Sequence, residues 1–361
     1  VMVFIIKFVL ELFVKTKFFD NRLAFFIGVD KKDIPNIEKN EAPTKLKPFK
    51  KLEFMKYRKW HLLPTLIIIV IAICCLFTKG LNLGIDYKGG TDITMTGKED
   101  IILKDIRTDI DKLELSAAEI DNIDSKTVYI KLEDVLSKDD TETLNDFFSN
   151  KYKADVDIGV VSNIVKKELT MNAIYAITLS LIGMIIYVSI RFKFSFAIAS
   201  IVALIHDVIM VFAVFAIFRI EISVIFIAAI LTTIGYSIND TIVIFDRIRE
   251  TIKDKYNNNV STNEIMHDII NDSLRGTLTR TIFTTITVIF PVVCLIFFGA
   301  YEINNFNIAI LIGLIAGVYS TVLLAPQLWC LLESKNMGKE PKKKPKQKKE
   351  LEELSIKGIN A

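Results

Sequence analysis

The sequence predicts an α-helical polytopic membrane protein whose six transmembrane helices carry one small α+β domain. The 361 residues are 51% hydrophobic and 24% charged, yet the mean hydropathy reaches +0.40. The charge must therefore be segregated from long apolar blocks, as in membrane proteins. Crossing about 30 Å of hydrocarbon takes about 20 helical residues. The blocks of this length are Trp60–Thr78, Met171–Ile190, Phe194–Phe218, Ile222–Phe245, Thr281–Ala300 and Ile303–Leu332. They place helix 1 at residues 60–78 and helices 2–6 within residues 171–332.

The polar stretch between the first two blocks, residues 79–170, is predicted to form the α+β domain. Alternating apolar residues indicate strands, and apolar residues three to four positions apart indicate helices. Ser137, followed by Asp140, is typical of a helix start. The order of elements predicts helices packed on one sheet. The predicted strands are Asp92–Thr96, Thr127–Leu132 and Asp155–Val161, and the predicted helices are Glu99–Leu113 and Ser137–Tyr152.

Basic residues at the block ends predict the orientation. Lys and Arg gather before the first block, between the second and third, between the fourth and fifth, and in the tail at residues 333–361. The positive-inside rule places these segments in the cytoplasm and residues 79–170 outside. The basic tail is then a cytoplasmic anchor, with contact to anionic lipid or ribosomal RNA as an alternative.

Composition argues against two other classes of protein. A net charge of +3 is too small for a typical nucleic-acid-binding protein, so no specific nucleic-acid partner is expected. The sequence has three histidines, and its four cysteines lie in apolar runs without the spacing of a zinc site or a disulfide framework. No metal site is therefore predicted.

The fourth block contains an acid, Asp240, inside LTTIGYSINDTIVIFDRIRE. An ionised carboxylate there costs about 3 kcal/mol on insertion scales, so the group must be neutral, paired or in contact with water. Helical spacing places Thr233, Tyr236 and Ser237 on the same stripe as Asp240. Such a stripe faces other protein or a wet cavity rather than lipid.

Arg280 begins the fifth block, which runs antiparallel to the fourth, at a depth comparable to that of Asp240. The guanidinium would keep the carboxyl ionised, and moving it away would favour proton uptake. The pair therefore fits a proton relay, and it equally fits a static ion pair that locks two helices.

His206 and Asp207 form a titratable pair near the middle of the third block. A structural role and a place in a proton path are both open. An intramembrane aspartyl protease using Asp207 and Asp240 is a further hypothesis. Depth argues against it: Asp207 lies about 20 Å from the cytoplasmic side and Asp240 about 9 Å, whereas a dyad needs carboxylates about 3 Å apart.

Two groups of small residues stand out. Gly313 and Gly317 predict close helix packing in the sixth block. The segment LGIDYKGGT follows the first block and predicts a turn before the first strand, not a phosphate-binding loop, since no helix follows. Its motif residues are Gly84, Asp86, Gly89, Gly90 and Thr91.

Taken together, these segments resemble the SecF family of bacterial protein-export subunits. The matching segments are FMKYRK (Phe54–Lys59), LGIDYKGGT, the His206–Asp207 pair, GYSINDTIVIFDRIRE and LTRT (Leu278–Thr281). The resemblance implies the resistance-nodulation-division (RND) superfamily, an RND-type bundle of six helices and a ferredoxin-like extracytoplasmic domain between helices 1 and 2. By motif, Asp240 and the preceding Asn239 match the family's intramembrane acid site, and Arg280 matches its basic partner. The loop around NNNVSTNE (Asn257–Glu264) looks longer than is usual in the family.

The resemblance implies a function. The chain would be a non-enzymatic, proton-motive-force-coupled accessory subunit of the Sec translocase that promotes export of unfolded preproteins. It would lie in the bacterial cytoplasmic (inner) membrane with both termini of the SecF part in the cytoplasm. Its partners would be SecD, SecYEG, YidC or YajC, the preprotein and membrane lipid. No cofactor is expected, and the coupling ion is a proton, with sodium as the alternative.

The N-terminal residues resemble the end of SecD. Residues 1–29 would be the tail of a preceding SecD-like last helix, and residues 30–59 a cytoplasmic linker. The chain would then be the second half of a SecD–SecF fusion, and a free-standing SecF is the alternative. A rival function is half of an RND-type small-molecule or lipid exporter, which the small outside domain disfavours.

Overall fold

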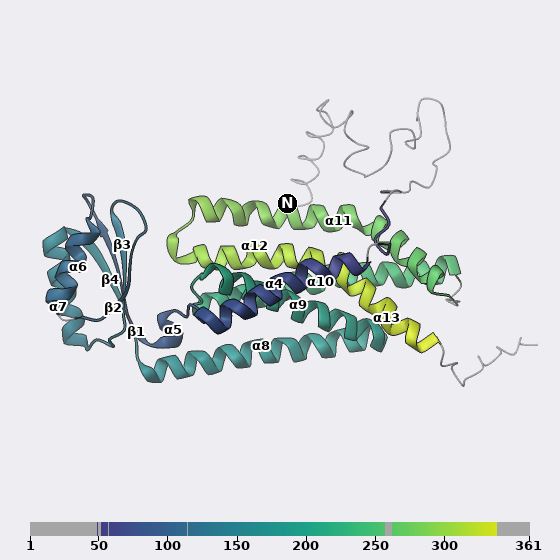
Figure 1. Ribbon diagram of the computed structural model, residues 1–361, viewed down its shortest axis with the longest axis horizontal. Helices are drawn as coiled ribbons and strands as arrows, with labels where there is room; N and C mark the ends of the chain where they lie inside the picture. Colours follow the sequence, from purple (N-terminus) through teal and green to yellow (C-terminus); the bar gives the residue numbers. More distant parts are fainter. Residues whose placement is uncertain (1–48, 50–51, 57, 114, 257–261, 338–361) are drawn as a thin grey trace, which may run out of the picture.

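A computed structural model describes residues 49, 52–56, 58–113, 115–256 and 262–337. Long helices run side by side in a bundle, and a small sheet domain lies at one end (Figure 1). We call this the domain end and the opposite end the basic end. The expected SecD-like tail, nearly all of the linker, residues 257–261 of the long loop and the lysine-rich part of the tail lie outside the described residues.

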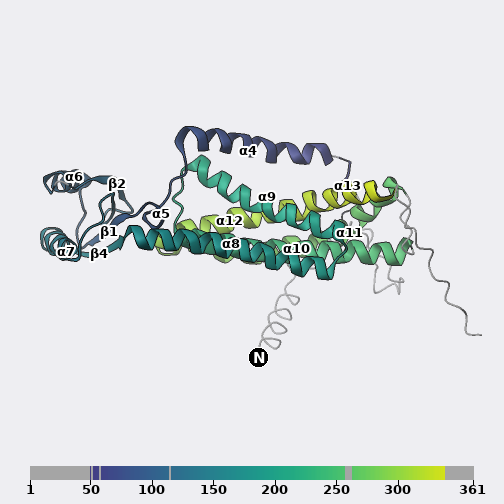
Figure 2. The same ribbon diagram turned by 90° about the horizontal axis from the view of Figure 1, so that it is seen from below.

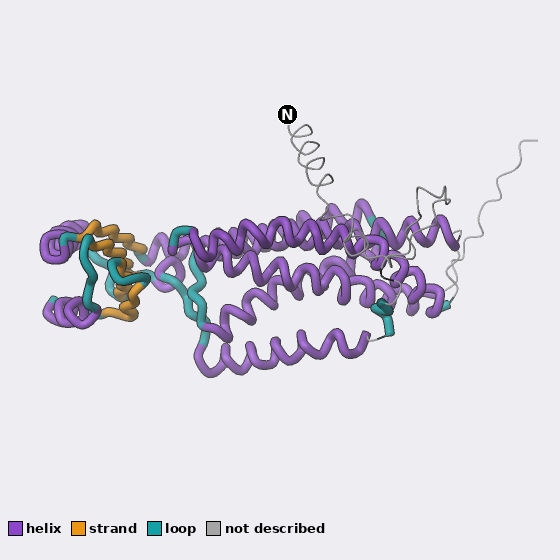
Figure 3. The backbone as a smooth tube through the Cα atoms, turned by 90° about the horizontal axis from the view of Figure 1, so that it is seen from above, coloured by secondary structure: helices purple, strands orange, loops and turns teal. Residues whose placement is uncertain are grey.

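The bundle is built from the apolar blocks. By length and composition, five described helical segments suit a membrane crossing, and the apolar part of α4, Leu63–Lys79, is shorter. Each apolar block of the sequence coincides for most of its length with one of these helical segments, and several helices continue past the apolar block. Figures 2 and 3 show α4 along one side of the bundle, next to α9. The bounds are α4 (Arg58–Lys79), α8 (Asn163–Arg191), α9 (Phe194–Phe218), α10 (Val224–Tyr256), α11 (Asn263–Phe298), α12 (Asn304–Tyr319) and α13 (Ala325–Met337).

The last crossing changes its hydrogen-bonding pattern partway. A π-helical turn, η4 (Ser320–Leu324), joins α12 to α13, and Pro326 follows it. Proline has no backbone N–H and its ring collides with the carbonyl four residues earlier, so the regular α-helical ladder is interrupted there. Single π-turns often occur at functional sites.

The sheet domain has four antiparallel strands in the order β2-β3-β1-β4. Helices α6 and α7 cover one face, where Ile93, Met95, Ile130 and Phe148 form a buried core. The predicted capping box at the start of α7 is confirmed: Ser137 accepts from the Asp140 N–H, and Asp140 accepts from the Ser137 N–H. The bounds are α5 (Ile85–Lys88), β1 (Gly90–Gly97), α6 (Leu103–Lys112), β2 (Ala117–Asn122), β3 (Thr127–Leu132), α7 (Lys138–Tyr152) and β4 (Ala154–Val161).

The open face of the sheet rests on the outer loops of the bundle. The Lys131 Nζ atom on β3 pairs with the Glu221 carboxylate between α9 and α10 at 2.9 Å. The rings of Tyr129 and Tyr301 lie 6.5 Å apart. Asp86 in α5 accepts a 2.8 Å hydrogen bond from the Val224 N–H at the start of α10. These contacts fix the domain against the ends of α9, α10 and α11.

Candidate functional site

Asp240 lies on α10 and lines a cavity of about 200 Å³ between α10, α11 and α12. Its side chain is partly buried. The cavity is polar along much of its wall, although the helices around it are apolar, so it provides a place for water or an ion next to the carboxyl. The polar lining residues are Tyr236, Ser237, Asn239, Asp240, Thr284, Thr285 and Thr287.

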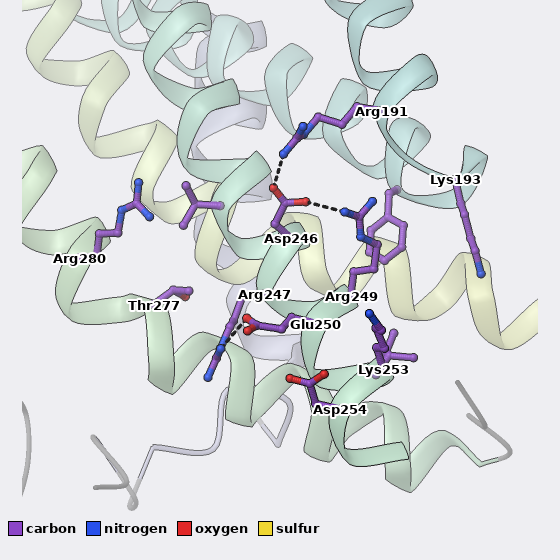
Figure 4. Close-up of a pocket in the computed structure, with 13 residues that line it drawn as sticks. Arg191, Lys193, Asp246, Arg247, Arg249, Glu250, Lys253, Asp254, Thr277 and Arg280 are labelled. Carbon is purple, nitrogen blue, oxygen red and sulfur yellow. Dashed lines mark hydrogen bonds and ion pairs between the residues drawn. The ribbon is translucent and has the colours of Figure 1, made fainter. Parts of the chain in front are cut away.

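Arg280 lies on α11 and lines a second, larger cavity of about 980 Å³ at the basic end (Figure 4). The Arg280 charge acts electrostatically on Asp240. In Figure 4, however, Arg280 makes no ion pair with the other residues drawn, and no ion pair joins it to Asp240 among the described side chains. The two predicted partners are thus neighbours on antiparallel helices without direct contact in this conformation.

A polar face is left uncovered within this part of the bundle. Tyr236 is 44% exposed, and Asn239 and Arg280 are exposed as well. Tyr236 and Asn239 line the same cavity as Asp240, and Arg280 lies on the neighbouring helix α11. Polar and charged groups at such depth do not face lipid, because hydrocarbon offers them no hydrogen-bonding partner. Exposure of these groups to lipid would therefore be costly.

Asp207 on α9 is fully buried and has its own hydrogen-bond network. Its Oδ2 atom accepts from the hydroxyls of Ser237 on α10 and Ser320 in η4. Its Oδ1 atom lies 3.0 Å from the His206 Nδ1 atom. Both carboxyl oxygens are thus satisfied in the core. No described hydrogen bond joins Asp207 to Asp240.

His206 extends the network to α4. Its Nε2 atom lies 3.2 Å from the Thr65 hydroxyl, which in turn donates to the Tyr319 hydroxyl at 3.2 Å. The rings of His206 and Tyr319 stack at 5.7 Å. The His206–Asp207 pair consequently ties together α4, α9, α10 and the π-helical turn.

The glycines of α12 allow close approach to α10. A Cβ atom on Gly313 would lie 2.2 Å from the Thr233 hydroxyl oxygen, and one on Gly317 would lie 3.4 Å from the Ser237 Cβ atom. Thr233 and Ser237 are buried on the stripe that leads to Asp240. Packing of α12 against this stripe shapes the wall of the Asp240 cavity.

The glycine motif after α4 forms the junction between domain and bundle. Gly89 and Gly90 have φ values of 78° and 132°. Residues that carry a side chain rarely adopt such backbone angles. A Cβ atom on Gly90 would lie 2.4 Å from the Leu132 carbonyl oxygen. Thr91 is buried and donates to the Asp134 carbonyl at 2.8 Å. A Cβ atom on Gly84 would lie 2.6 Å from a Glu221 carboxylate oxygen.

Sequence reasoning did not identify several members of these clusters. Thr284, Thr285 and Thr287 could have been noticed, because FTTIT is an unusually hydroxyl-rich run for an apolar helix. Ser320 and Thr65 carry no local signal, since their importance comes only from contact with Asp207 and His206. The described residues hold no group of three or more His, Cys, Asp or Glu side chains placed to bind a metal ion.

Fold and buried polar groups together define a polytopic α-helical membrane protein with a small sheet domain on the outer loops. Residues 141–335 match the family described as "Protein export membrane protein SecD/SecF, C-terminal". Residues 76–100, around the glycine motif, match the SecD/SecF GG motif. The chain belongs to the SecD/SecF protein-export family, in which it corresponds to the SecF part.

Individual relatives agree with this assignment. The chain is 34% identical to the protein translocase subunit SecF of Helicobacter pylori strain J99, over 80% of this chain and 89% of that protein. It is 38% identical to the subunit SecDF of Bacillus subtilis strain 168, over 94% of this chain and 46% of that protein. The chain thus spans about half the length of this SecDF relative.

A solved structure shows the same relationship. The crystal structure of SecDF from Thermus thermophilus, described as a translocon-associated membrane protein, superposes with a TM-score of 0.69 at 31% identity. The match covers 79% of this chain and 39% of the SecDF chain.

Proposed function

We propose that this chain is the SecF part of a proton-driven accessory unit of the Sec translocase, which promotes export of unfolded preproteins across the cytoplasmic membrane. Asp240 is the proton-binding group and Arg280 its counter-charge. The observation that carries the proposal is the placement of Asp240: it lines a polar cavity within apolar helices, next to an uncovered polar face and under the electrostatic influence of Arg280.

The uncovered face also supports a partner. Tyr236, Asn239 and Arg280 would be costly against lipid, so a second helical half covers them. The names of the SecDF relatives favour a SecD-like half, fused or separate, in this position. SecYEG, with YidC or YajC, would complete the assembly.

Protonation is the step that changes the charge balance. An ionised Asp240 is attracted by Arg280, and a protonated Asp240 is not, so proton uptake frees α10 and α11 to shift relative to each other. One charge crossing 100 mV supplies about 2.3 kcal/mol. That suffices to reorient a domain held by a few polar contacts.

The proposed topology has six membrane helices with both ends of the SecF part in the cytoplasm. Basic side chains at the basic end and the sheet domain at the other end favour this orientation. The strand and helix order βαββαβ and the sheet order β2-β3-β1-β4 favour a ferredoxin-like domain. This domain would meet the emerging preprotein outside.

The substitution Asp240→Asn tests the function. It keeps the size and polarity of the side chain but removes the titrating group. Cells or vesicles with this variant should insert the chain normally and lose the export that a proton gradient adds to ATP-driven transport. Asp146→Asn, on the exposed surface of the sheet domain, is the matched control and should export normally. Gradient-stimulated export at the wild-type rate in Asp240→Asn would reject the proposal.

Sodium coupling and small-molecule efflux are the competing functions. The hydroxyl-rich wall around Asp240 suits either ion, and replacing the sodium gradient while holding pH fixed distinguishes them. Co-purification with SecY and a SecD-like half would favour protein export, whereas a self-assembled trimer would favour efflux. A protease dyad of Asp207 and Asp240 is disfavoured, because both carboxyl oxygens of Asp207 are already hydrogen-bonded. Their partners are Ser237, Ser320 and His206.

A further inference from the structure

The cavity at the basic end carries more positive charge than Arg280 alone supplies. Six cationic and three acidic side chains line it, a net charge of +3. In Figure 4, Arg280 and Thr277 lie to one side of α10, and Lys193 lies to the other. The charged lining residues are Arg191, Lys193, Arg247, Arg249, Lys253, Arg280, Asp246, Glu250 and Asp254.

Some of these charges neutralise one another. The Asp246 carboxylate pairs with Arg191 at 2.6 Å and with Arg249 at 3.6 Å. Arg247 pairs with Glu250 at 2.6 Å. These pairs hold the guanidinium groups in place along α10.

Two lysines on the same cavity have no such partner. Among the described residues, neither Lys193 nor Lys253 forms an ion pair, and both line the cavity. The ring of Phe192 lies 5.7 Å from the Arg191 guanidinium carbon and 5.8 Å from that of Arg249. This contact steadies two further cations beside the lysines.

The neighbouring surface is apolar and exposed. At the basic end of α8, Ile190 is 83% exposed, and at the start of α9, Phe194 is 77% exposed. In a membrane protein such residues contact acyl chains. Arg191 directly follows Ile190, and Lys193 directly precedes Phe194. These cations therefore lie at the boundary between the hydrocarbon and the headgroup layer.

We propose that Lys193 and Lys253, with Arg191 and Arg249, bind the headgroup of an anionic phospholipid of the cytoplasmic leaflet. The phosphate oxygens accept hydrogen bonds from the ammonium and guanidinium groups, while the acyl chains lie along Ile190 and Phe194. A zwitterionic lipid carries the same phosphate but also a cation, so its net charge is zero and the cationic cluster attracts it less. The site depends on membrane insertion but not on proton coupling. The lipid site and the role of Asp240 can therefore be tested independently.

Retention of phosphatidylglycerol against phosphatidylcholine tests the site. The full chain, purified in mild detergent, is mixed with each lipid and the bound lipid is counted by native mass spectrometry. Wild type should retain phosphatidylglycerol at least five-fold more than phosphatidylcholine. The double variant Lys193→Gln with Lys253→Gln should lose most of this preference. Millimolar inorganic phosphate should leave it unchanged.

Two further double variants serve as controls. Lys104→Gln with Lys167→Gln removes the same charge from exposed positions at the domain end and should keep the preference. Lys193→Arg with Lys253→Arg keeps the charge and should keep it too, which separates a lost site from a misfolded chain. Equal retention of both lipids by wild type, undiminished preference in the Lys→Gln pair, equal loss in the domain-end pair, or displacement by free phosphate would each overturn the site.

Discussion

Asp207 accepts a hydrogen bond from Ser237, which lies three residues before Asp240 on α10. Among the described residues of the bundle, the most deeply buried acid is therefore hydrogen-bonded to the helical turn next to the proposed proton-binding acid. Since Ser320 and His206 also bond to this carboxylate, it joins three helical segments at one point. We interpret it as a positioning residue that sets the height and rotation of α10.

Substitution of Asp207 should therefore affect stability more than coupling. Asp207→Ala removes the acceptor of Ser237 and the partner of His206, whereas Ser320 can still donate to the Gly317 carbonyl. The change should cost about 2 kcal/mol, at about 1 kcal/mol for each lost bond. Asp207→Asn keeps one acceptor and should cost less, with gradient-stimulated export largely retained. Thermal unfolding in detergent and vesicle export measure the two effects. If a stable Asp207→Asn chain lost gradient-stimulated export, Asp207 would instead be assigned to the proton path.

Gly313 should not tolerate a side chain. In Gly313→Ala the added carbon meets the Thr233 side chain at 2.2 Å from Oγ1 and 2.9 Å from Cβ, so no rotation of Thr233 relieves the clash. Overpacking of this kind costs about 1–3 kcal/mol. Gly235→Ala on α10 has no heavy atom within 4 Å and should be neutral or slightly stabilising. The unfolding temperatures of the two variants test this difference. Equal changes in unfolding temperature for Gly313→Ala and Gly235→Ala would contradict the prediction.

Gly90 and Gly80 separate backbone strain from steric collision. Both have positive φ, but only at Gly90 would a Cβ atom meet backbone, 2.4 Å from the Leu132 carbonyl oxygen. Gly80→Ala should cost about 1–2 kcal/mol for the left-handed conformation. Gly90→Ala should cost about 1–3 kcal/mol more and loosen the sheet domain. Limited proteolysis of the domain reports the loosening, and similar digestion of both variants would argue against it.

The folded sheet domain should be more stable against unfolding at acidic pH than at neutral pH. Burial, aided by the negative charges of Asp86, Asp157 and Glu221, raises the pKa of Asp92 to about 6. The carboxyl lies over Gly159, where a Cβ atom would meet its Oδ1 atom at 2.3 Å. Because the folded-state pKa is raised, this contribution to stability is fully present below about pH 4, the ordinary range of an Asp, and is lost as the pH rises through about 6.

The substitution Asp92→Asn isolates this effect. The neutral amide should flatten the pH dependence of domain unfolding between about pH 4 and pH 7, measured by thermal unfolding of the full chain. Asp100→Asn removes an exposed carboxyl from the same domain and should leave the profile unchanged. An unaltered profile in Asp92→Asn would assign the pH dependence to other groups.

Sequence patterns predicted the elements that depend on local physics. The membrane helices follow from uninterrupted apolar runs, and the capping box of Ser137 and Asp140 follows from a spacing of three residues. The strand β2, Ala117–Asn122, was missed. It is short and polar, it pairs with β3 alone, and a register shift interrupts it near Glu119, so it lacks the apolar alternation that marks a strand.

The functional clusters were predicted only in part, because their members meet through tertiary contacts. Asp240 stood out since a carboxylate inside an apolar run is costly wherever it lies. Ser320 is 113 residues from Asp207 and Thr65 is 141 residues from His206, so no local pattern connects them. Matching depths suggested an Asp240–Arg280 pair, but depth does not fix the direction of a long side chain, and Arg280 lines the larger cavity instead.

Asp86 attaches the sheet domain to α10, the helix that carries Asp240. Its carboxylate caps the first backbone N–H of α10, and the same segment runs directly into β1 through Gly89 and Gly90. Under the proposed function, a preprotein that pulls on the sheet domain would therefore also pull on the start of α10. Coupling between two sites is reciprocal, so under the proposed function an opposing load on the sheet domain would retard proton uptake at Asp240.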